Sequence, residues 1–340
     1  MPKPDLQATP GSSSARDAET WGDLRLLGID IGGTNSRARL WARGQIAAES
    51  QASSASLAAV GLQAATSALA ALLSGADVTP EAPVDAVCVG SAGLSVPGAR
   101  QFLHGQVAPL TRSGTVVIVS DAMLVLPAAG LDSGVAVVCG TGSVAVGRCG
   151  DRTVQVGGWG YLLGDPGSGY WIVREAMRVL LRRRDHGEPL GELGHQLIAA
   201  TGSDDLAMLH RRYFEQPHVP GTWARPASVV LNSADPAAAE ILTSAAHAVG
   251  DLAEAAAAEL TGRAEPGSPA ACGPAGTGEL DQPSYLPVVL AGGLFRSQAL
   301  SRAALDAVAE ALPGVEASVL AAEPVAGAVQ LAGLAAQQAG

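Results

Sequence analysis

Hydrophobic and polar positions along the chain form blocks, and the order of the blocks repeats once. Residues 24–50 predict a strand, a glycine turn, a second strand, a short turn at Arg43-Gly44 and a third strand. Residues 134–158 predict the same succession. After each group, apolar strands alternate with helices, which is typical of an α/β layer fold. Two similar halves indicate two domains with a cleft between them, where ligands prefer to bind.

The remaining apolar segments predict the elements that complete each half. The first half is expected to add a helix at 57–75 and buried strands at 84–93 and 115–121. The second half is expected to add helices at 168–184, within 189–215 and at 235–261, a strand at 287–295, a helix at 297–312, a short strand in 317–324 and a last helix at 325–338. Residues 1–22 are expected to form a disordered tail, and the Pro-, Gly- and Ala-rich residues 263–286 a flexible loop.

Composition limits the classes of partner. The 340 residues suit two domains, and a hydrophobic fraction of 48% supports a sizeable core. A net charge of -11 argues against a nucleic-acid partner. The N-terminus lacks an apolar signal segment, and no run approaches the ~18 uninterrupted apolar residues of a membrane helix, so we expect a cytoplasmic protein without membrane attachment. The Ala-rich helix at 235–261 suits either a homodimer interface or a core.

The cysteines are scattered along the chain. Cys88, Cys139, Cys149 and Cys272 form no CxxC pair, and three of them lie in apolar or glycine-rich runs. Free thiols in a reducing compartment are the simplest interpretation.

The segment GIDIGGT, residues 28–34, places a carboxylate inside an apolar strand. Asp30 lies between two isoleucines, where a charge is costly unless it is paired, hydrogen-bonded or bound to a metal. Gly32 and Gly33 allow close approach of the backbone, and Thr34 adds a hydroxyl and an amide. The pattern is typical of a hairpin that holds phosphate and Mg²⁺, and the alternative is a plain turn with a solvent-facing Asp. It is not the Lys-containing P-loop.

Three further turns carry candidate chemistry. The equivalent turn of the second half is Gly140, Thr141, Gly142 and Ser143, and two such hairpins could hold one polyphosphate, although a simple hairpin turn also explains it. Asp121 ends a buried strand, where α/β folds place their chemistry, or it caps the next helix. Gly292 and Gly293 would let a base or ribose lie on the backbone, or they form a tight turn.

In this order the segments resemble the actin/hexokinase/Hsp70 ATPase superfamily. The run GGWGYLLGDPGSGYW at 157–171 resembles the N-acetylglucosamine kinase branch of the BadF/BadG/BcrA/BcrD-type ATPase family. The resemblance covers the chain from about Leu24 to the C-terminus. It implies an α/β fold of two ribonuclease-H-like, actin-like ATPase domains flanking an ATP and sugar cleft. The first domain would span 23–126 and the second 127–325, with a terminal helix at 326–340 that packs back on the first.

The resemblance also implies an activity and roles for named residues. The activity is an ATP- and Mg²⁺-dependent transfer of the γ-phosphate to the 6-hydroxyl of an amino sugar, with N-acetylglucosamine as the leading substrate. Asp121 would be the catalytic base and Asp30 would hold the hydrated Mg²⁺. The phosphates would be bound by Gly32, Gly33, Thr34, Gly140, Thr141, Gly142 and Ser143, and the adenosine by Gly292 and Gly293. The sugar would be contacted by Ser91, Gly93, Gly158, Trp159, Gly160 and Asp165. For Asp165 an N-cap on the helix after Pro166 is the structural alternative.

One departure leaves the exact sugar open. Relatives carry a sugar-contacting Asn after the third strand, whereas residues 47–60 here read AAESQASSASLAAV. Glucosamine is the nearest rival substrate. Two alternatives lie outside the sugar kinases. One is a dehydratase activator, which needs an iron–sulfur cluster on cysteines. The other is a nucleotide-switched scaffold of the actin or Hsp70 type, which needs no sugar loop. The ROK sugar kinases carry a Cys-rich zinc motif that is absent here.

Overall fold

The computed structural model describes residues 21–215, 220–262 and 286–339, and the chain divides into two compact units. The first unit comprises Met1–Gly130 and Ala322–Gly340, and the second is Leu131–Ala321. These divisions lie a few residues from the expected boundaries at 126/127 and 325/326. The short helix α4 (Val125–Ala128) packs within the first unit, so the chain leaves that unit later than expected.

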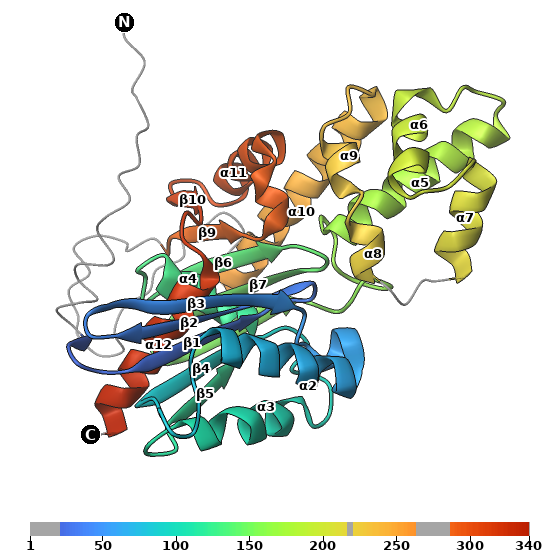
Figure 1. The fold of residues 1–340 in the computed structure, drawn as a ribbon. Coiled ribbons are helices and arrows are strands. Elements are labelled where there is room, and N and C mark those ends of the chain that lie inside the picture. Colours follow the sequence, from blue (N-terminus) through green and yellow to red (C-terminus); the bar gives the residue numbers. More distant parts are fainter. Residues whose placement is uncertain (1–20, 216–219, 263–285, 340) are drawn as a thin grey trace, which may run out of the picture. The chain divides into compact units, whose positions relative to one another are not determined.

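The first unit is a mixed sheet with helices on both faces (Figure 1). Its other elements are β1 (Leu26–Ile31), β2 (Asn35–Ala42), β3 (Gln45–Ser53), α2 (Leu57–Gly75), β4 (Ala86–Ser91), α3 (Ala99–Val107), η1 (Ala108–Leu110), β5 (Val116–Val119), η2 (Asp121–Leu124) and α12 (Pro324–Ala339). The strand order is β3-β2-β1-β4-β5. β1, β2 and β3 are antiparallel neighbours, whereas β4 and β5 continue the sheet parallel to β1.

Side-chain alternation along β1 assigns each face of the first sheet to different helices. Leu27, Ile29 and Ile31 share a buried cluster with residues of α2 and α3. Leu26 shares a second cluster with Ala328 and other residues of α12. Because Asp30 has the parity of Leu26, it belongs to the α12 face of the sheet.

The second unit repeats the topology of the first. Its elements are β6 (Gly134–Cys139), β7 (Ser143–Cys149), β8 (Arg152–Gly157), α5 (Gly169–Asp185), α6 (Gly191–Ala200), α7 (Leu206–Glu215), α8 (Pro220–Ala224), α9 (Ala227–Leu231), α10 (Pro236–Thr261), β9 (Val288–Ala291), η3 (Gly293–Arg296), α11 (Gln298–Ala311) and β10 (Ala317–Val319). The sheet order, β8-β7-β6-β9-β10, matches β3-β2-β1-β4-β5, with antiparallel and parallel pairs in the same places. The predicted repetition of the two halves is confirmed.

The Ala-rich helix α10 contributes to the core of the second unit. Ala245, Ala253 and Ala256 are fully buried in its main hydrophobic cluster, beside residues of β6 and α5. Small side chains let helix and sheet approach closely, so a core role accounts for the alanines on this face.

Three sequence expectations need correction. The predicted tail at 1–22 ends earlier than expected, because Trp21 is buried and its ring packs on Gly333 of α12. The free-thiol interpretation is wrong for Cys149, which is disulfide-bonded, although Cys88 and Cys139 are free and buried. Cys272 and all but the last residue of the predicted loop at 263–286 lie outside the described residues, and that last residue, Leu286, is buried.

Within the described residues, one helix has the length and apolar composition needed to cross a membrane. This helix, α2, is interrupted at Gly61, where φ is 75° and ψ is 171°. Its buried residues Ala68, Leu69 and Leu72 pack in the core of the first unit.

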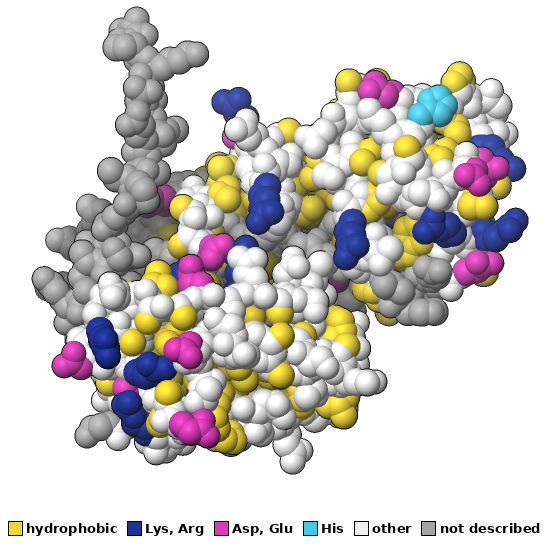
Figure 2. Space-filling view, viewed as in Figure 1, with side chains coloured by type: hydrophobic (Ala, Val, Ile, Leu, Met, Phe, Trp, Pro, Cys, Tyr) yellow, Lys and Arg dark blue, Asp and Glu magenta, His cyan; other side chains and the backbone are white. Residues whose placement is uncertain are grey.

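Charged side chains of both signs are interspersed over the face shown in Figure 2. The described residues in this view therefore present a mixed surface, and the net charge of -11 gives the whole chain an acidic balance. A mixed acidic surface does not concentrate polyanions.

Candidate active site

Two carboxylates meet on the first sheet. Asp30, in β1, lies opposite Arg37 of β2 and beside Gly90 of β4. Asp121 begins η2, directly after the parallel strand β5. Parallel strands end at one edge of a sheet, which brings the two side chains together. Burial raises the pKa of Asp30 to about 7, the negative charge of Asp121 adds to this rise, and Arg37 opposes it. Asp30 is thus a half-buried strand residue, and the solvent-facing turn is excluded.

Local hydrogen bonds orient Asp121. Its Oδ1 accepts from the Ala122 amide at 3.0 Å and from the Ser120 hydroxyl at 3.3 Å. Burial raises the pKa of Asp121, and these bonds oppose the rise. Ser120 is the N-cap residue of η2, and its side chain makes no capping bond. The arrangement yields an oriented carboxylate of increased proton affinity, which suits a base.

The carboxylates of Asp30 and Asp121 suit a magnesium ion that also binds the phosphates of a nucleotide. Asp30 and Asp121 are two desolvated groups of like charge, and a cation would relieve both costs. In the described part of the chain no group of three or more His, Cys, Asp or Glu could hold a metal. Mg²⁺ needs fewer protein ligands because it keeps waters and phosphate oxygens, often with one or two carboxylates. Gly33 is exposed at the adjacent turn, where an added Cβ would meet nothing within 4 Å.

We expect Asp30→Asn to gain stability relative to the natural protein as pH rises from about 4 to about 8 without Mg²⁺. The pKa of Asp30 is 3.8 in the unfolded chain, and burial raises it to about 7 in the folded unit. Between these values the folded carboxyl keeps its proton and the unfolded one has lost it, so the free energy of unfolding falls as pH rises. Asn carries no such cost. Thermal unfolding of both proteins at several pH values measures the difference.

The exposed Asp23 provides the control for this measurement. Asp23→Asn makes the same chemical change at an exposed position and is measured over the same pH range. A flat difference in melting temperature for Asp30→Asn would contradict a raised pKa at Asp30.

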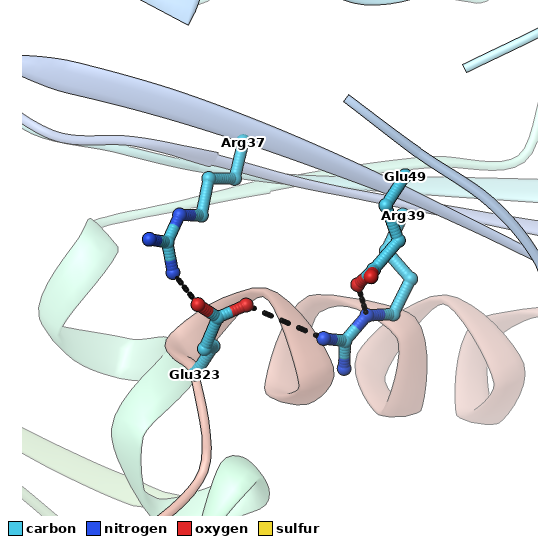
Figure 3. Close-up of polar contacts among 4 residues, drawn as sticks. All are labelled: Arg37, Arg39, Glu49 and Glu323. Carbon is cyan, nitrogen blue, oxygen red and sulfur yellow. Dashed lines mark hydrogen bonds and ion pairs between the residues drawn. The ribbon is translucent and has the colours of Figure 1, made fainter. Parts of the chain in front are cut away.

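Arg37, which lies opposite Asp30 in the hairpin register, belongs to an ion-pair network (Figure 3). Glu323, just before α12, pairs with both Arg37 and Arg39, the second at 3.4 Å, and Arg39 also pairs with Glu49 at 2.7 Å. The network joins β2, β3 and the start of α12. Partly exposed pairs contribute little stability individually, so its clearer effect is to orient Arg37 near Asp30. Sequence reasoning missed Arg37, although the hairpin register around the Gly32-Gly33 turn places it opposite Asp30.

The serine segment that replaces the expected Asn is engaged within the first unit. The Ser54 hydroxyl donates to the Gly32 carbonyl at 2.8 Å, and the Ser56 hydroxyl donates to the Ala92 carbonyl at 3.0 Å. Ser91, a predicted sugar residue, is buried and also donates to the Ala92 carbonyl, and the next glycine, Gly93, has φ of 75°. The serines therefore connect the turn at 32–35 to the turn at 91–93.

The second unit brings the turn at 140–143 together with the glycines after β9. The Gly140 amide donates to the Gly142 carbonyl at 2.9 Å and closes the turn. Gly292 has φ of 114°, and an added Cβ would lie 2.1 Å from the Cys139 carbonyl oxygen. Close packing of two strand ends therefore requires Gly292. By contrast, a Cβ on Gly140 or Gly293 would meet nothing within 4 Å, so their backbones are open to a ligand.

The loop at 157–168 exposes its tip and buries its carboxylate. Trp159 is 81% exposed, whereas Asp165 is buried with φ of 54°. The Asp165 Oδ1 accepts from the Gly160 amide at 3.2 Å. Burial raises the pKa of Asp165, and its backbone hydrogen bonds oppose the rise. The N-cap interpretation of Asp165 is wrong, because the Ser168 side chain caps α5 by accepting from the Trp171 amide.

Comparison with known proteins gives this arrangement a context. The sequence profile of the BadF/BadG/BcrA/BcrD ATPase family matches residues 27–332. A crystal structure from Chromobacterium violaceum, described as a candidate N-acetylglucosamine kinase, is 27% identical with a TM-score of 0.66 and covers 91% of this chain and 99% of that one. The likeness confirms the expected fold class.

Two relatives align over shorter segments. An N-acetylmuramic acid/N-acetylglucosamine kinase of Clostridium acetobutylicum is 35% identical over 103 residues, which are 29% of this chain and 33% of that protein. An N-acetyl-D-glucosamine kinase of Dictyostelium discoideum is 31% identical over 137 residues, 38% of this chain and 43% of that protein. The matched part thus spans less than half of each relative.

Proposed function

Because the chain belongs to the BadF/BadG/BcrA/BcrD ATPase family, we propose that it is an ATP-dependent kinase of amino sugars, with the 6-hydroxyl of N-acetylglucosamine as the leading acceptor. The observation that carries the proposal is the electrostatic interaction of two desolvated carboxylates, Asp30 in β1 and Asp121 at the start of η2. The names of both aligned relatives support the class of sugar. A reaction that consumes ATP fits the cytoplasm as its compartment.

In this proposal the first unit supplies the proton acceptor. Asp121 takes the proton of the sugar hydroxyl, and the Ala122 amide orients the accepting carboxylate. Asp30 would hold Mg²⁺, which when bound would supply neutralisation of charge on the phosphates. Arg37 stands beside Asp30 and limits the repulsion between the two carboxylates.

Backbone groups at three glycine turns bind the nucleotide. Gly32, Gly33 and Thr34 form the turn of the first unit beside the phosphates. The Gly32 amide closes this turn by donating to the Asn35 carbonyl at 3.0 Å, and Gly33 and Thr34 contact phosphate oxygens through their amides and the Thr34 hydroxyl. In the second unit Gly140, Thr141, Gly142 and Ser143 form the corresponding turn beside the phosphates, with the Ser143 side chain directed to the loop at 157–168, and Gly292 and Gly293 support the adenosine. The open space above Gly33, Gly140 and Gly293 supports this assignment.

The sugar is bound by the loop at 157–168 and by the turn at 91–93. The exposed ring of Trp159 offers an apolar face, and Asp165 accepts hydrogen bonds from sugar hydroxyls as an ionised carboxylate. Gly158 and Gly160 keep the loop thin beside the sugar ring. Ser91 and Gly93 contact the sugar from the turn at 91–93.

A coupled assay of ADP release with ATP and Mg²⁺ tests the proposal. The panel contains N-acetylglucosamine, glucosamine, N-acetylmannosamine, N-acetylmuramic acid, glucose and a blank without sugar. We expect turnover with N-acetylglucosamine well above the blank. Turnover with glucosamine alone would move the acceptor to the unacetylated sugar. Turnover equal to the blank with every sugar would exclude an amino-sugar kinase.

A further inference from the structure

Hydrogen bonds join the turn at 140–143 to the loop at 157–168. The Ser143 hydroxyl donates to the Pro166 carbonyl at 2.8 Å, and the Gly158 amide donates to the Ser143 carbonyl at 3.0 Å. The Gly169 amide, just after the loop, donates to the Gly140 carbonyl at 2.8 Å. The side chain of Ser143 is buried and faces the loop. Turn and loop therefore form one hydrogen-bonded body within the second unit.

Asp165 needs this support to keep its conformation. Its φ of 54° lies in the left-handed region, which costs a non-glycine residue on the order of 1–2 kcal/mol. It also precedes Pro166, and a residue before proline prefers extended backbone. The bond from Ser143 to the Pro166 carbonyl restrains the peptide between Pro166 and Gly167, one residue after Asp165. Without it, relaxation of Asp165 toward the extended region is favoured.

The carboxylate of Asp165 lies directly against the same turn. A Cβ added to Gly142 would sit 2.5 Å from Asp165 Oδ2, and the amide of Ser143 hydrogen-bonds to the carboxylate. The absence of a side chain at Gly142 thus leaves the volume that the carboxylate occupies. Two residues of the turn therefore constrain where the Asp165 carboxylate lies: Ser143 through its hydrogen bonds and Gly142 through its lack of a Cβ.

We propose that Ser143 and Gly142 are positioning residues for the sugar, which act through Asp165 from within the turn assigned to the nucleotide. The inference rests on the proposed function, in which Asp165 contacts sugar hydroxyls. It separates two roles of the turn: the open space beside Gly140 is left for the nucleotide, whereas the Ser143 side chain and Gly142, which has no side chain, serve the sugar loop.

The test is calorimetric titration of Ser143→Ala with N-acetylglucosamine and, separately, with a non-hydrolysable ATP analogue and Mg²⁺. We expect the sugar Kd to rise about tenfold, which is the loss of one supporting hydrogen bond, while the nucleotide Kd stays within about twofold. In steady state, kcat/KM for the sugar should fall more than kcat/KM for ATP. A uniform loss of structure would lower both alike.

Two further variants sharpen the result. Gly142→Ala should also raise the sugar Kd, because its methyl group displaces the Asp165 carboxylate, and it keeps the test open if Ser143→Ala folds poorly. Ser50→Ala is the matched control: it deletes a hydroxyl-to-carbonyl bond of 2.6 Å, to Leu72 in the first unit, and should change neither Kd.

Each other outcome overturns the inference. A rise in nucleotide Kd with unchanged sugar Kd would make the Ser143 hydroxyl a phosphate ligand. Equal rises in the sugar Kd and the nucleotide Kd, or no change in either, would mean that the hydrogen bonds between turn and loop serve only packing. If the natural protein bound neither ligand, the proposed function itself would fail. If it bound both ligands and the variants matched it, only the positioning role would fail.

Discussion

Replacing Asp121 by Asn is expected to lower kcat by ~10²–10⁴ while the nucleotide Kd stays within about twofold. Asn has nearly the shape of Asp and can keep the hydrogen bond from the Ala122 amide. It has no basic oxygen to receive the proton of the attacking hydroxyl. The loss should therefore appear in the chemical step, which single-turnover measurement of ADP formation isolates.

Folding must be controlled in this experiment. Burial raises the pKa of Asp121, so a neutral side chain there removes a desolvation cost, and the variant should melt no lower than the natural protein. The exposed Asp23→Asn serves as the matched substitution and should keep full turnover. Turnover of Asp121→Asn within about threefold of the natural protein would reject Asp121 as the base.

Replacing Gly327 by Ala is expected to destabilise the protein by about 3 kcal/mol. A Cβ at this position of α12 would lie 2.0 Å from the Leu124 carbonyl oxygen and 2.8 Å from the Ala128 amide. Both are backbone atoms of η2 and α4, which cannot turn aside as a side chain can. Ala favours helices over Gly by roughly 1 kcal/mol, and the clash outweighs this gain. The melting temperature should fall by roughly 5–10 °C.

Gly105→Ala gives the opposite expectation from the same chemical change. Gly105 lies in α3, and a Cβ there would meet nothing within 4 Å. This variant should gain roughly 0.5–1 kcal/mol from helix propensity alone. If Gly327→Ala melts with or above the natural protein, the packing of α12 against η2 is looser than described.

Much of the fold follows from local pattern. Both hairpins can be predicted from the apolar strands that flank the Gly32-Gly33 and Gly140–Ser143 turns. The repetition of this pattern predicts that the two units share one topology. The proximity of Asp30 and Asp121 could also be predicted, because both residues lie near the carboxyl ends of parallel strands of one sheet.

What could not be predicted depends on contacts between distant segments. The left-handed backbone of Asp165 is disfavoured locally, and the hydrogen bond that Ser143, over twenty residues earlier, donates to the Pro166 carbonyl beside it is a contact between distant segments. The need for glycine at 292 comes from the Cys139 carbonyl on another strand. Composition predicts glycine-rich turns at both places. It carries no information about the distant neighbours that constrain Asp165 or require glycine at 292.

The route of the chain through the first unit has a consequence for its biosynthesis. Leu26, Cys88 and Leu124 form a buried cluster with Ala328 and Ala332 of α12, near the end of the chain. All of the second unit, Leu131–Ala321, emerges from the ribosome before α12 does. The second unit can therefore complete its core while one face of the earlier sheet is still open to solvent. A nascent chain halted before Pro324 would expose that face to chaperones, so the unit translated first is the last to finish folding.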